Sequence, residues 1–343
     1  MRPIVDVYKL GRLSYAKTLD VQKSLFERLK AEKPFLSFDG CKDEHSGKSQ
    51  TIPSSGSRSH HQQTDGRINQ VPLDRNQTTT TPFNGFHISN LRSSLILVEH
   101  DPVYTVGLRT TQYDDKYVSR LKYKLEEHKL KAEFFKTNRG GLITFHGPGQ
   151  LVVYPILNLT EFKSSIKGAS VRAFVNLLEL TIIDTLTQIG IAGAHTVKEY
   201  PGVWVDNGER KVAFIGITCK RRITMHGISI NCDCDLKWFD FIVSCGIEEK
   251  QITSIQRELL LGDSSRHNLG TLETHERGFR DNEYDDKVGS LDMIGLPKTR
   301  SNLYSPCSIE EVAKEFCRAF SRRFSCTFKE VSNSEVSDIK QKL

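Results

Sequence analysis

Apolar residues recur at helical spacing in three parts of the chain. A helix is predicted from about Tyr15 to Ala31, and a longer amphipathic helix between Gly168 and Gln188. A third is predicted after Ser308, which forms a capping box with Glu311. The apolar faces of these three helices comprise Leu19, Leu25, Phe26 and Leu29, then Val171, Phe174, Val175, Leu178, Ile182 and Leu186, then Ile309, Val312, Phe316 and Phe320.

Short apolar runs between these helices predict strands. SLILVEH reads as a buried strand that ends in a turn, and VYTVG begins the next strand. RGGLITFHGPGQLVVYPILNL predicts two strands flanking a glycine-rich loop. GVWVD, KVAFIGITC and GISINCDCD predict an antiparallel meander. Strands interleaved with helices indicate a mixed α/β (α+β) fold with a mixed sheet.

Two polar stretches interrupt this pattern. Residues 39–85 hold too few apolar side chains to offset the entropy of ordering, so we expect a disordered insertion. Residues 262–304 are charged, and we expect a flexible insertion there. Neither stretch separates two self-sufficient apolar cores, so the sequence predicts one catalytic-type domain with two polar insertions. That domain comprises residues 1–38, 86–261 and 305–330, and a polar tail is expected over 331–343.

Charge and composition narrow the class of protein. The formal net charge is +6; 39–85 is neutral and 262–304 carries −2, so the remainder carries +8. A basic domain attracts acidic partners, but no basic helix or aromatic sheet motif favours nucleic acid. No apolar run approaches the roughly 18 residues that cross a bilayer. The cysteines follow no signal-peptide core and form no C-x-x-C, so we expect neither a disulfide framework nor a metal site.

Two residues stand out as candidates for chemistry. Cys245 lies in VSCGI, where the following glycine leaves the sulfur accessible, although a free cysteine is more often a small core residue. Lys211 begins an apolar strand, where partial desolvation suits a base, although a lysine at a turn is usually only solvated. His146 and His226 each precede glycine, and either a ligand contact or a structural role fits them.

Taken in order, five segments closely resemble the lipoyl(octanoyl) transferase family, in particular its animal mitochondrial branch. RGG-x(4)-FHGPGQ and the block from Lys211 to Cys245 are each specific, and their joint occurrence makes chance a poor explanation. Both polar stretches lie outside the resemblance. The segments are LGRLSYAKTLDVQ, LVEHDPVYTVGLR, RGGLITFHGPGQLVVYPILNL, GVWVDNGERKVAFIGITCKRRITMHGISINCDCDLKWFDFIVSCGI and ITSIQREL.

The resemblance implies the catalytic-domain fold of biotin and lipoate protein ligases and a set of site residues. It implies that Cys245 is the nucleophile that carries the acyl group as a thioester, and that Lys211 is the base that activates it. Ser244 departs from the proline that the family commonly has before the nucleophile. The implied acyl-pocket residues are Arg139, Gly140, Gly141, Leu142, Ile143, Thr144, Phe145, His146, Phe214, Ile215, Gly216, Gly227, Ile228 and Ser229.

The implied reaction transfers an octanoyl group from octanoyl-acyl carrier protein to a lysine of lipoyl domains in mitochondria. The acceptors are the lipoyl domains of 2-oxoacid dehydrogenase complexes and the glycine cleavage H protein. Thioester exchange is nearly even in energy, so no cofactor and no ATP are expected. Backbone N–H groups of Gly140, Gly141 or Gly216 are candidates to hold the oxyanion. Three alternatives stay open: an ATP-dependent lipoate or biotin ligase, an inactive acyl-binding homologue, and a thioesterase.

Overall fold

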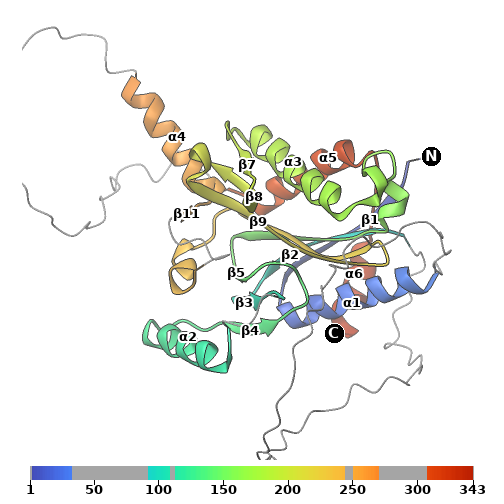
Figure 1. Cartoon of the computed structure of the whole chain (residues 1–343), viewed down its shortest axis with the longest axis horizontal. Coiled ribbons are helices and arrows are strands. Elements are labelled where there is room, and N and C mark those ends of the chain that lie inside the picture. The colour runs from blue at the N-terminus through green and yellow to red at the C-terminus, as the bar shows by residue number, and fades with distance from the viewer. Residues whose placement is uncertain (1, 33–91, 109–112, 244–249, 270–306, 343) are drawn as a thin grey trace, which may run out of the picture.

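A mixed sheet runs through the middle of the molecule (Figure 1). The computed structural model describes residues 2–32, 92–108, 113–243, 250–269 and 307–342. The strand order is β12-β1-β2-β6-β10-β9-β8-β7, and β11 pairs with β9. The strands are β1 (Ile4–Leu13), β2 (Ser94–His100), β6 (Gln150–Ile156), β7 (His195–Val197), β8 (Tyr200–Val205), β9 (Arg210–Lys220), β10 (Ile223–Asn231), β11 (Gln251–Ile252) and β12 (Thr327–Glu330).

Parallel and antiparallel pairs occupy different parts of this sheet. β1 pairs in parallel with both β12 and β2, and β11 pairs in parallel with β9. The pairs from β2 through β6, β10, β9 and β8 to β7 are antiparallel. The predicted meander is therefore confirmed as β8, β9 and β10, although β10 ends at Asn231, before the two neighbouring cysteines.

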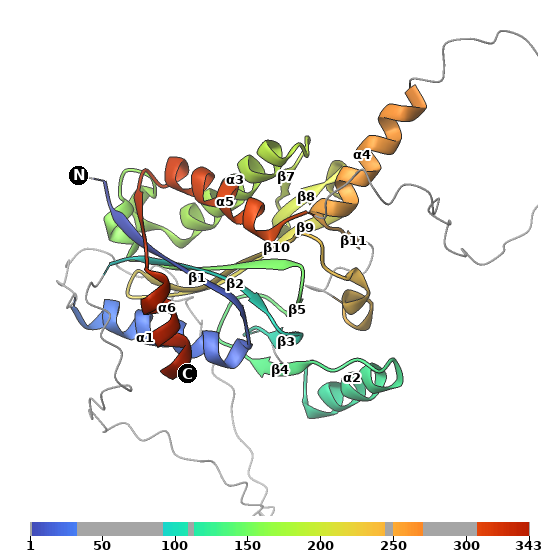
Figure 2. The same cartoon turned by 180° about the vertical axis from the view of Figure 1, so that it is seen from behind.

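Helices cover both faces of the large sheet (Figures 1 and 2). α3 (Val171–Ile189) and α5 (Ile309–Arg323) pack together on one face, where Phe174, Phe316 and Phe320 are buried. α1 (Tyr15–Glu32) and α6 (Asn333–Lys342) lie on the other face. α4 (Ile255–Leu269) follows β11. Short 3₁₀ helices are η1 (Leu159–Phe162), η2 (Lys167–Ala169), η3 (Asp206–Gly208) and η4 (Leu236–Phe241).

A second sheet of three strands lies beside the first, in the order β4-β3-β5. β3 (Val103–Val106) pairs in parallel with β4 (Glu133–Lys136) and antiparallel with β5 (Ile143–His146). α2 (Asp115–Glu127) and η4 share a third apolar cluster with this sheet. Inside the cluster the ring of Phe145 stacks on that of Trp238, with centroids 4.9 Å apart. The small sheet is thereby held against the loop that follows β10.

The predicted helices and the mixed α/β class are confirmed, and the structure adds helical segments that were not predicted, α4 and α6 among them. Residues 333–342, part of the predicted polar tail, form α6, and the side chains of Val336 and Ile339 are buried against β1. α4 extends to Leu269, inside the segment expected to be an insertion. Residues 39–85 lie outside the described part of the chain, as do 270–304 and Ser244 and Cys245. Among the helices that the structure describes, none has the length and apolar character of a bilayer span.

Candidate active site

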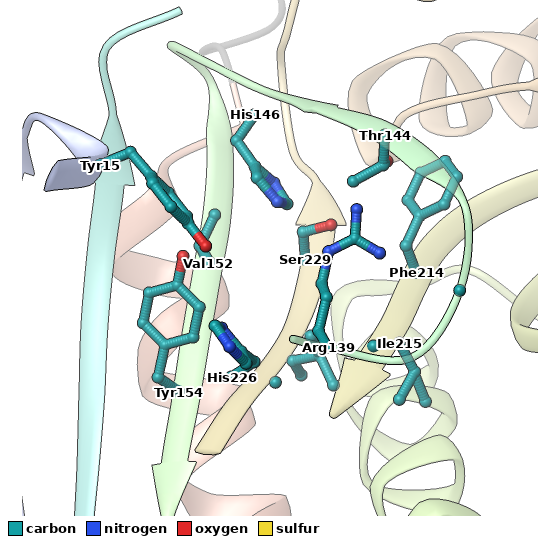
Figure 3. A pocket seen from close by; sticks show the side chains of 14 residues that line it. Tyr15, Arg139, Thr144, His146, Val152, Tyr154, Phe214, Ile215, His226 and Ser229 are labelled. Carbon is teal, nitrogen blue, oxygen red and sulfur yellow. The ribbon is translucent and has the colours of Figure 1, made fainter. Parts of the chain in front are cut away.

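A cavity lies between the two sheets and is lined mainly by strands (Figure 3). β5 of the small sheet forms one wall, and β6, β9 and β10 of the large sheet form the other. The loop 139–141 and the start of α1 complete the lining. The cavity volume is about 40 Å³. The lining residues are Tyr15, Arg139, Gly141, Thr144, His146, Val152, Tyr154, Phe214, Ile215, Gly216, His226, Gly227, Ile228 and Ser229.

Most of the predicted pocket residues line this cavity, and alternation along β5 explains why Ile143 and Phe145 do not. Thr144 and His146 point into the cavity, whereas Ile143 and Phe145 point into the apolar cluster behind it. Successive side chains of a strand face opposite sides, so both pairs cannot serve the pocket. Gly140 and Leu142 also lie off the lining. Tyr15, Val152 and Tyr154 also line the cavity and were not predicted from the sequence.

Hydrogen bonds from the Arg139 guanidinium to backbone oxygens hold the loop beside the cavity. Arg139 Nη2 donates to the backbone oxygen of Thr105 at 2.6 Å and to that of Leu142 at 2.9 Å. Nη1 donates to the Gly140 oxygen at 2.9 Å. The rigid fork of the arginine thus ties 139–142 to β3.

Two glycines let the loop approach the sheets. A side chain on Gly107 would meet the Gly141 oxygen at 2.3 Å, and one on Gly216 would meet the Gly140 oxygen at 2.9 Å. Gly140 N donates to the Ile217 oxygen at 3.0 Å. This amide hydrogen already has a backbone acceptor, so Gly140 would have to give up this bond to hold the oxyanion, and the three glycine candidates stay predictions.

Lys211 lies at the Phe214 end of the cavity and is buried, with 1% of its surface exposed. Its Nζ donates to the Pro201 oxygen at 2.8 Å and lies 5.0 Å from the ring centroids of both Trp204 and Phe214. Aromatic faces attract an amine that carries positive charge. The amine is therefore fixed in place beside a residue that lines the pocket.

Glu179 of α3 holds the backbone of Gly202 in β8, next to the Lys211 side chain. This role of Glu179 was not predicted from the sequence. Glu179 Oε1 accepts a hydrogen bond from Gly202 N at 3.0 Å. Burial raises the pKa of this carboxyl, while the Gly202 bond and the charge of Lys211 act in the opposite direction. A single acidic residue in an apolar helix face gives no local signal of this role.

A polar network runs from the cavity to the strand that carries Lys211. His146 Nδ1 lies 2.7 Å from Gln150 Oε1, and Gln150 Nε2 donates to Asn231 Oδ1 at 2.8 Å. Asn231 Nδ2 donates in turn to the Thr253 oxygen at 2.8 Å, and Thr253 N donates to the Lys211 oxygen at 2.9 Å. Each buried group thus finds a partner, which fixes β5, β6, β10 and β11 relative to one another.

Three histidines around the cavity are held neutral. Burial lowers the pKa of His146 to about 3, and His100 nearby adds to this effect. Burial likewise lowers the pKa of His100 to about 4 and that of His226 to about 4. His100 Nε2 lies 2.8 Å from the Tyr154 hydroxyl, whose hydrogen it accepts as a neutral ring. The histidines around the pocket therefore carry no charge near neutral pH, and the charged group among the lining residues is the Arg139 guanidinium.

Three other polar atoms of the lining have no hydrogen-bond partner within the described part of the chain. They are Thr144 Oγ1, Ser229 Oγ and His226 Nδ1. Buried polar atoms normally have partners, so three orphans around one cavity mark a place where a ligand supplies them. Among the described residues, no cluster of histidine, cysteine and acidic side chains suits a metal ion.

The two sheets and the pocket between them define a mixed α/β domain with a site suited to a small, largely apolar ligand. The family model described as the lipoyl protein ligase A/B catalytic domain matches residues 81–265. The chain belongs to this family, and the predicted resemblance is confirmed.

Relatives of the chain are named as octanoyltransferases. The mitochondrial octanoyl-acyl-carrier-protein:protein N-octanoyltransferase of Danio rerio is 50% identical over 171 residues, which are 50% of this chain and 70% of that protein. The octanoyltransferase of Thermoanaerobacter sp. (strain X514) is 45% identical over 48% of this chain and 66% of its own length. The mitochondrial octanoyltransferase of Arabidopsis thaliana is 39% identical over 48% of this chain and 65% of its own length.

A solved structure of the bipartite lipoate protein ligase of Thermoplasma acidophilum is similar with a TM-score of 0.48 and 10% identity. The similarity covers 99% of this chain and 92% of that chain. A likeness this distant carries no argument about function.

Proposed function

We propose that the chain is an octanoyltransferase that moves an octanoyl group from octanoyl-acyl carrier protein to a lysine of a lipoyl domain. The observation that carries this proposal is the buried amine of Lys211 beside Phe214, a residue that lines the apolar pocket. Relatives up to 50% identical are named for this reaction. Those of Danio rerio and Arabidopsis thaliana are named mitochondrial, and we place this chain in mitochondria as well.

Cys245 is proposed as the nucleophile. It lies outside the described residues, but the described residues on either side of 244–249 converge on the strand of Lys211. Val243 and Ile252 line the same surface hollow, and Ile252 pairs with Lys211 in the β11–β9 register. A thiol needs a neighbouring base to become a nucleophilic thiolate.

The reaction proceeds in two balanced halves. Lys211, in its neutral form, takes the proton of Cys245, and the sulfur bonds to the acyl carbon. The bond from that carbon to the carrier-protein sulfur breaks, and the departing thiolate takes the proton from Lys211. The acceptor lysine then attacks the same carbon, the bond to Cys245 breaks, and the amine proton passes to the departing thiolate through Lys211. The unpartnered hydroxyls of Thr144 and Ser229 are the donors proposed for the acyl oxygen.

Binding of the acyl chain requires the pocket walls to separate. A volume of about 40 Å³ holds only a few water molecules, which is less than an eight-carbon chain needs. The loop 139–142 belongs to neither sheet, but the Arg139 hydrogen bonds hold it. Entry of the acyl chain must therefore break some of these bonds or displace side chains of the other walls.

The acceptors proposed are the lipoyl domains of 2-oxoacid dehydrogenase complexes and the glycine cleavage H protein. The test is to incubate the full chain with octanoyl-acyl carrier protein and a lipoyl domain without ATP, and to follow both proteins by intact mass. The chain should gain one octanoyl group transiently and the lipoyl domain permanently.

Two substitutions separate the proposed roles. Cys245→Ala should abolish labelling of the chain, and Lys211→Met should slow transfer by about 100-fold or more, the usual contribution of a positioned base. Cys219→Ala and Lys220→Ala are matched controls on the same strand and should keep transfer. Undiminished transfer by Cys245→Ala would falsify the proposal.

A further inference from the structure

His226 lines the cavity on the side away from Phe214 (Figure 3), and one of its ring nitrogens has no hydrogen-bond partner among the described residues. Its side chain is buried, with 2% exposed, and Nε2 lies 2.7 Å from Asn138 Oδ1. Because that oxygen is an acceptor, Nε2 carries the ring hydrogen, and Nδ1 is left as a buried lone pair. Nδ1 has no hydrogen-bond partner in the described structure.

The backbone holds this ring in place at a conformational cost. His226 has a φ of +61°, in the left-handed region that side chains other than glycine rarely adopt. Its N–H donates to Gln22 Oε1 at 3.1 Å. The next residue, Gly227, lies so close to β6 that a side chain there would meet the Val153 oxygen at 2.0 Å. Strain of this kind persists where the surroundings fix it, and it is common at ligand sites.

The register of β9 and β10 sets how far this ring lies from the reactive end. Ser229 is opposite Phe214, and His226 is opposite Ile217. The Ser229–Phe214 pair and the His226–Ile217 pair are therefore three residues apart, which is about 10 Å along a strand. Lys211 Nζ lies 5.0 Å from the centroid of the Phe214 ring. The Ser229–Phe214 pair is therefore at the end of the pocket where the proposed base lies.

Figure 3 shows Thr144 and Phe214 on one side of the pocket and His226 and Tyr154 on the other. The distance of about 10 Å between the Ser229–Phe214 pair and the His226–Ile217 pair is comparable to the length of an extended eight-carbon chain.

We propose that His226 is the end wall of the acyl pocket and selects chains by their length and terminal group. The proposal rests on the octanoyltransferase function proposed above. Longer alkyl chains are rejected, because they must displace a fixed ring and cover an unpaired nitrogen. A chain of the same length that ends in a hydroxyl is accepted, because the hydroxyl donates to Nδ1.

The test compares octanoyl, decanoyl and 7-hydroxyheptanoyl carrier-protein donors, with transfer to a lipoyl domain measured by mass. The 7-hydroxyheptanoyl group has as many chain atoms as octanoyl, and the wild-type chain should transfer it within a few-fold of octanoyl. The decanoyl group should be transferred at least about 10-fold less well, a usual penalty for misfit in an apolar pocket. This arm needs no variant. Equal kcat/KM for octanoyl and decanoyl donors would overturn the length limit, and poor transfer of the hydroxylated donor would overturn the role of Nδ1.

Two variants test whether His226 sets the selectivity for chain length. His226→Gly and His226→Asn both suit a positive φ and shorten the side chain. Each should raise the decanoyl-to-octanoyl ratio of kcat/KM by about 10-fold, and His226→Gly should also lose use of the hydroxylated donor. His128→Asn, on the exposed end of α2, is the control. A ratio that stays at the wild-type value in both variants contradicts the proposal, whereas absence of octanoyl transfer by the wild type contradicts the proposed function instead.

Discussion

Gly202 is a residue whose missing side chain makes room for Lys211. Its φ is +123°, and a Cβ there would lie 2.4 Å from the Ala213 oxygen and 2.8 Å from Lys211 Cε. We predict that Gly202→Ala displaces the amine and lowers kcat/KM by about 10-fold or more, with about 1–3 kcal/mol of lost stability from the strained backbone. Transfer kinetics and urea unfolding measure the two effects.

The control for this prediction is Gly193→Ala. Gly193 also has a positive φ, of +74°, but nothing lies within 4 Å of the added carbon. This variant should lose stability from strain alone and keep its activity. Normal activity in Gly202→Ala would show that the position of Lys211 does not depend on the glycine.

The buried histidines predict how stability changes with pH. Burial lowers the pKa of His100 to about 4 and that of His146 to about 3, from 6.5 in an unfolded chain. Below pH 6.5 the unfolded chain therefore binds protons that the folded protein does not, so the free energy of unfolding falls as pH falls toward about 4. Each histidine contributes at most about 1.4 kcal/mol per pH unit.

Urea unfolding between about pH 7 and pH 5 measures this slope. His100→Gln should make it shallower, while His195→Gln, away from the pocket, should leave it as in the wild type. A slope that is unchanged by His100→Gln would contradict the assignment.

α6 has a mostly polar sequence, but two of its side chains are buried in the core and contribute to stability. Val336 and Ile339 are 7% and 4% exposed, and they join the cluster that contains Tyr8 and Leu10 of β1. We predict that Ile339→Ala lowers the free energy of unfolding by about 2–3 kcal/mol, as expected for truncating a buried aliphatic side chain. Ser337→Ala, on the exposed side of the same helix, should change it by less than about 0.5 kcal/mol. Equal effects would mean that α6 does not pack.

Elements with a strong local pattern were predictable from sequence, and those that depend on distant partners were not. The Ser308 cap was read from its spacing with Glu311, and its side chain does accept from Glu311 N. β12 was missed because TFKE is short and half polar; it is a strand through pairing with Ile4–Val7. In the pocket, sequence motifs identified the walls that β5, β9 and β10 form, whereas Tyr15 reaches the pocket from α1 only through tertiary packing. The role of Cys245 as nucleophile remains a prediction.

For the molecule as a whole, charge predicts how partners are found. The net charge outside the two polar stretches is +8, as counted from the sequence. Acidic carrier and lipoyl domains would be steered toward it, so kcat/KM should fall as salt screens the attraction, with kcat little changed. A neutral donor, octanoyl-pantetheine, is the control for the carrier step and should show little salt dependence. Equal salt effects on both donors would exclude steering.

The parallel pairing of β1 with β12 has a consequence for how the protein reaches its fold. Val5 and Val7 lie on a strand that pairs with residues 327–330, and they share a cluster with Phe316 and Phe320. During synthesis on a ribosome, β1 therefore cannot have this edge covered until residues 327–330 have been made. Such distant pairing slows folding and leaves an edge open to association with other chains, so we expect this protein to depend on chaperones while it is being made.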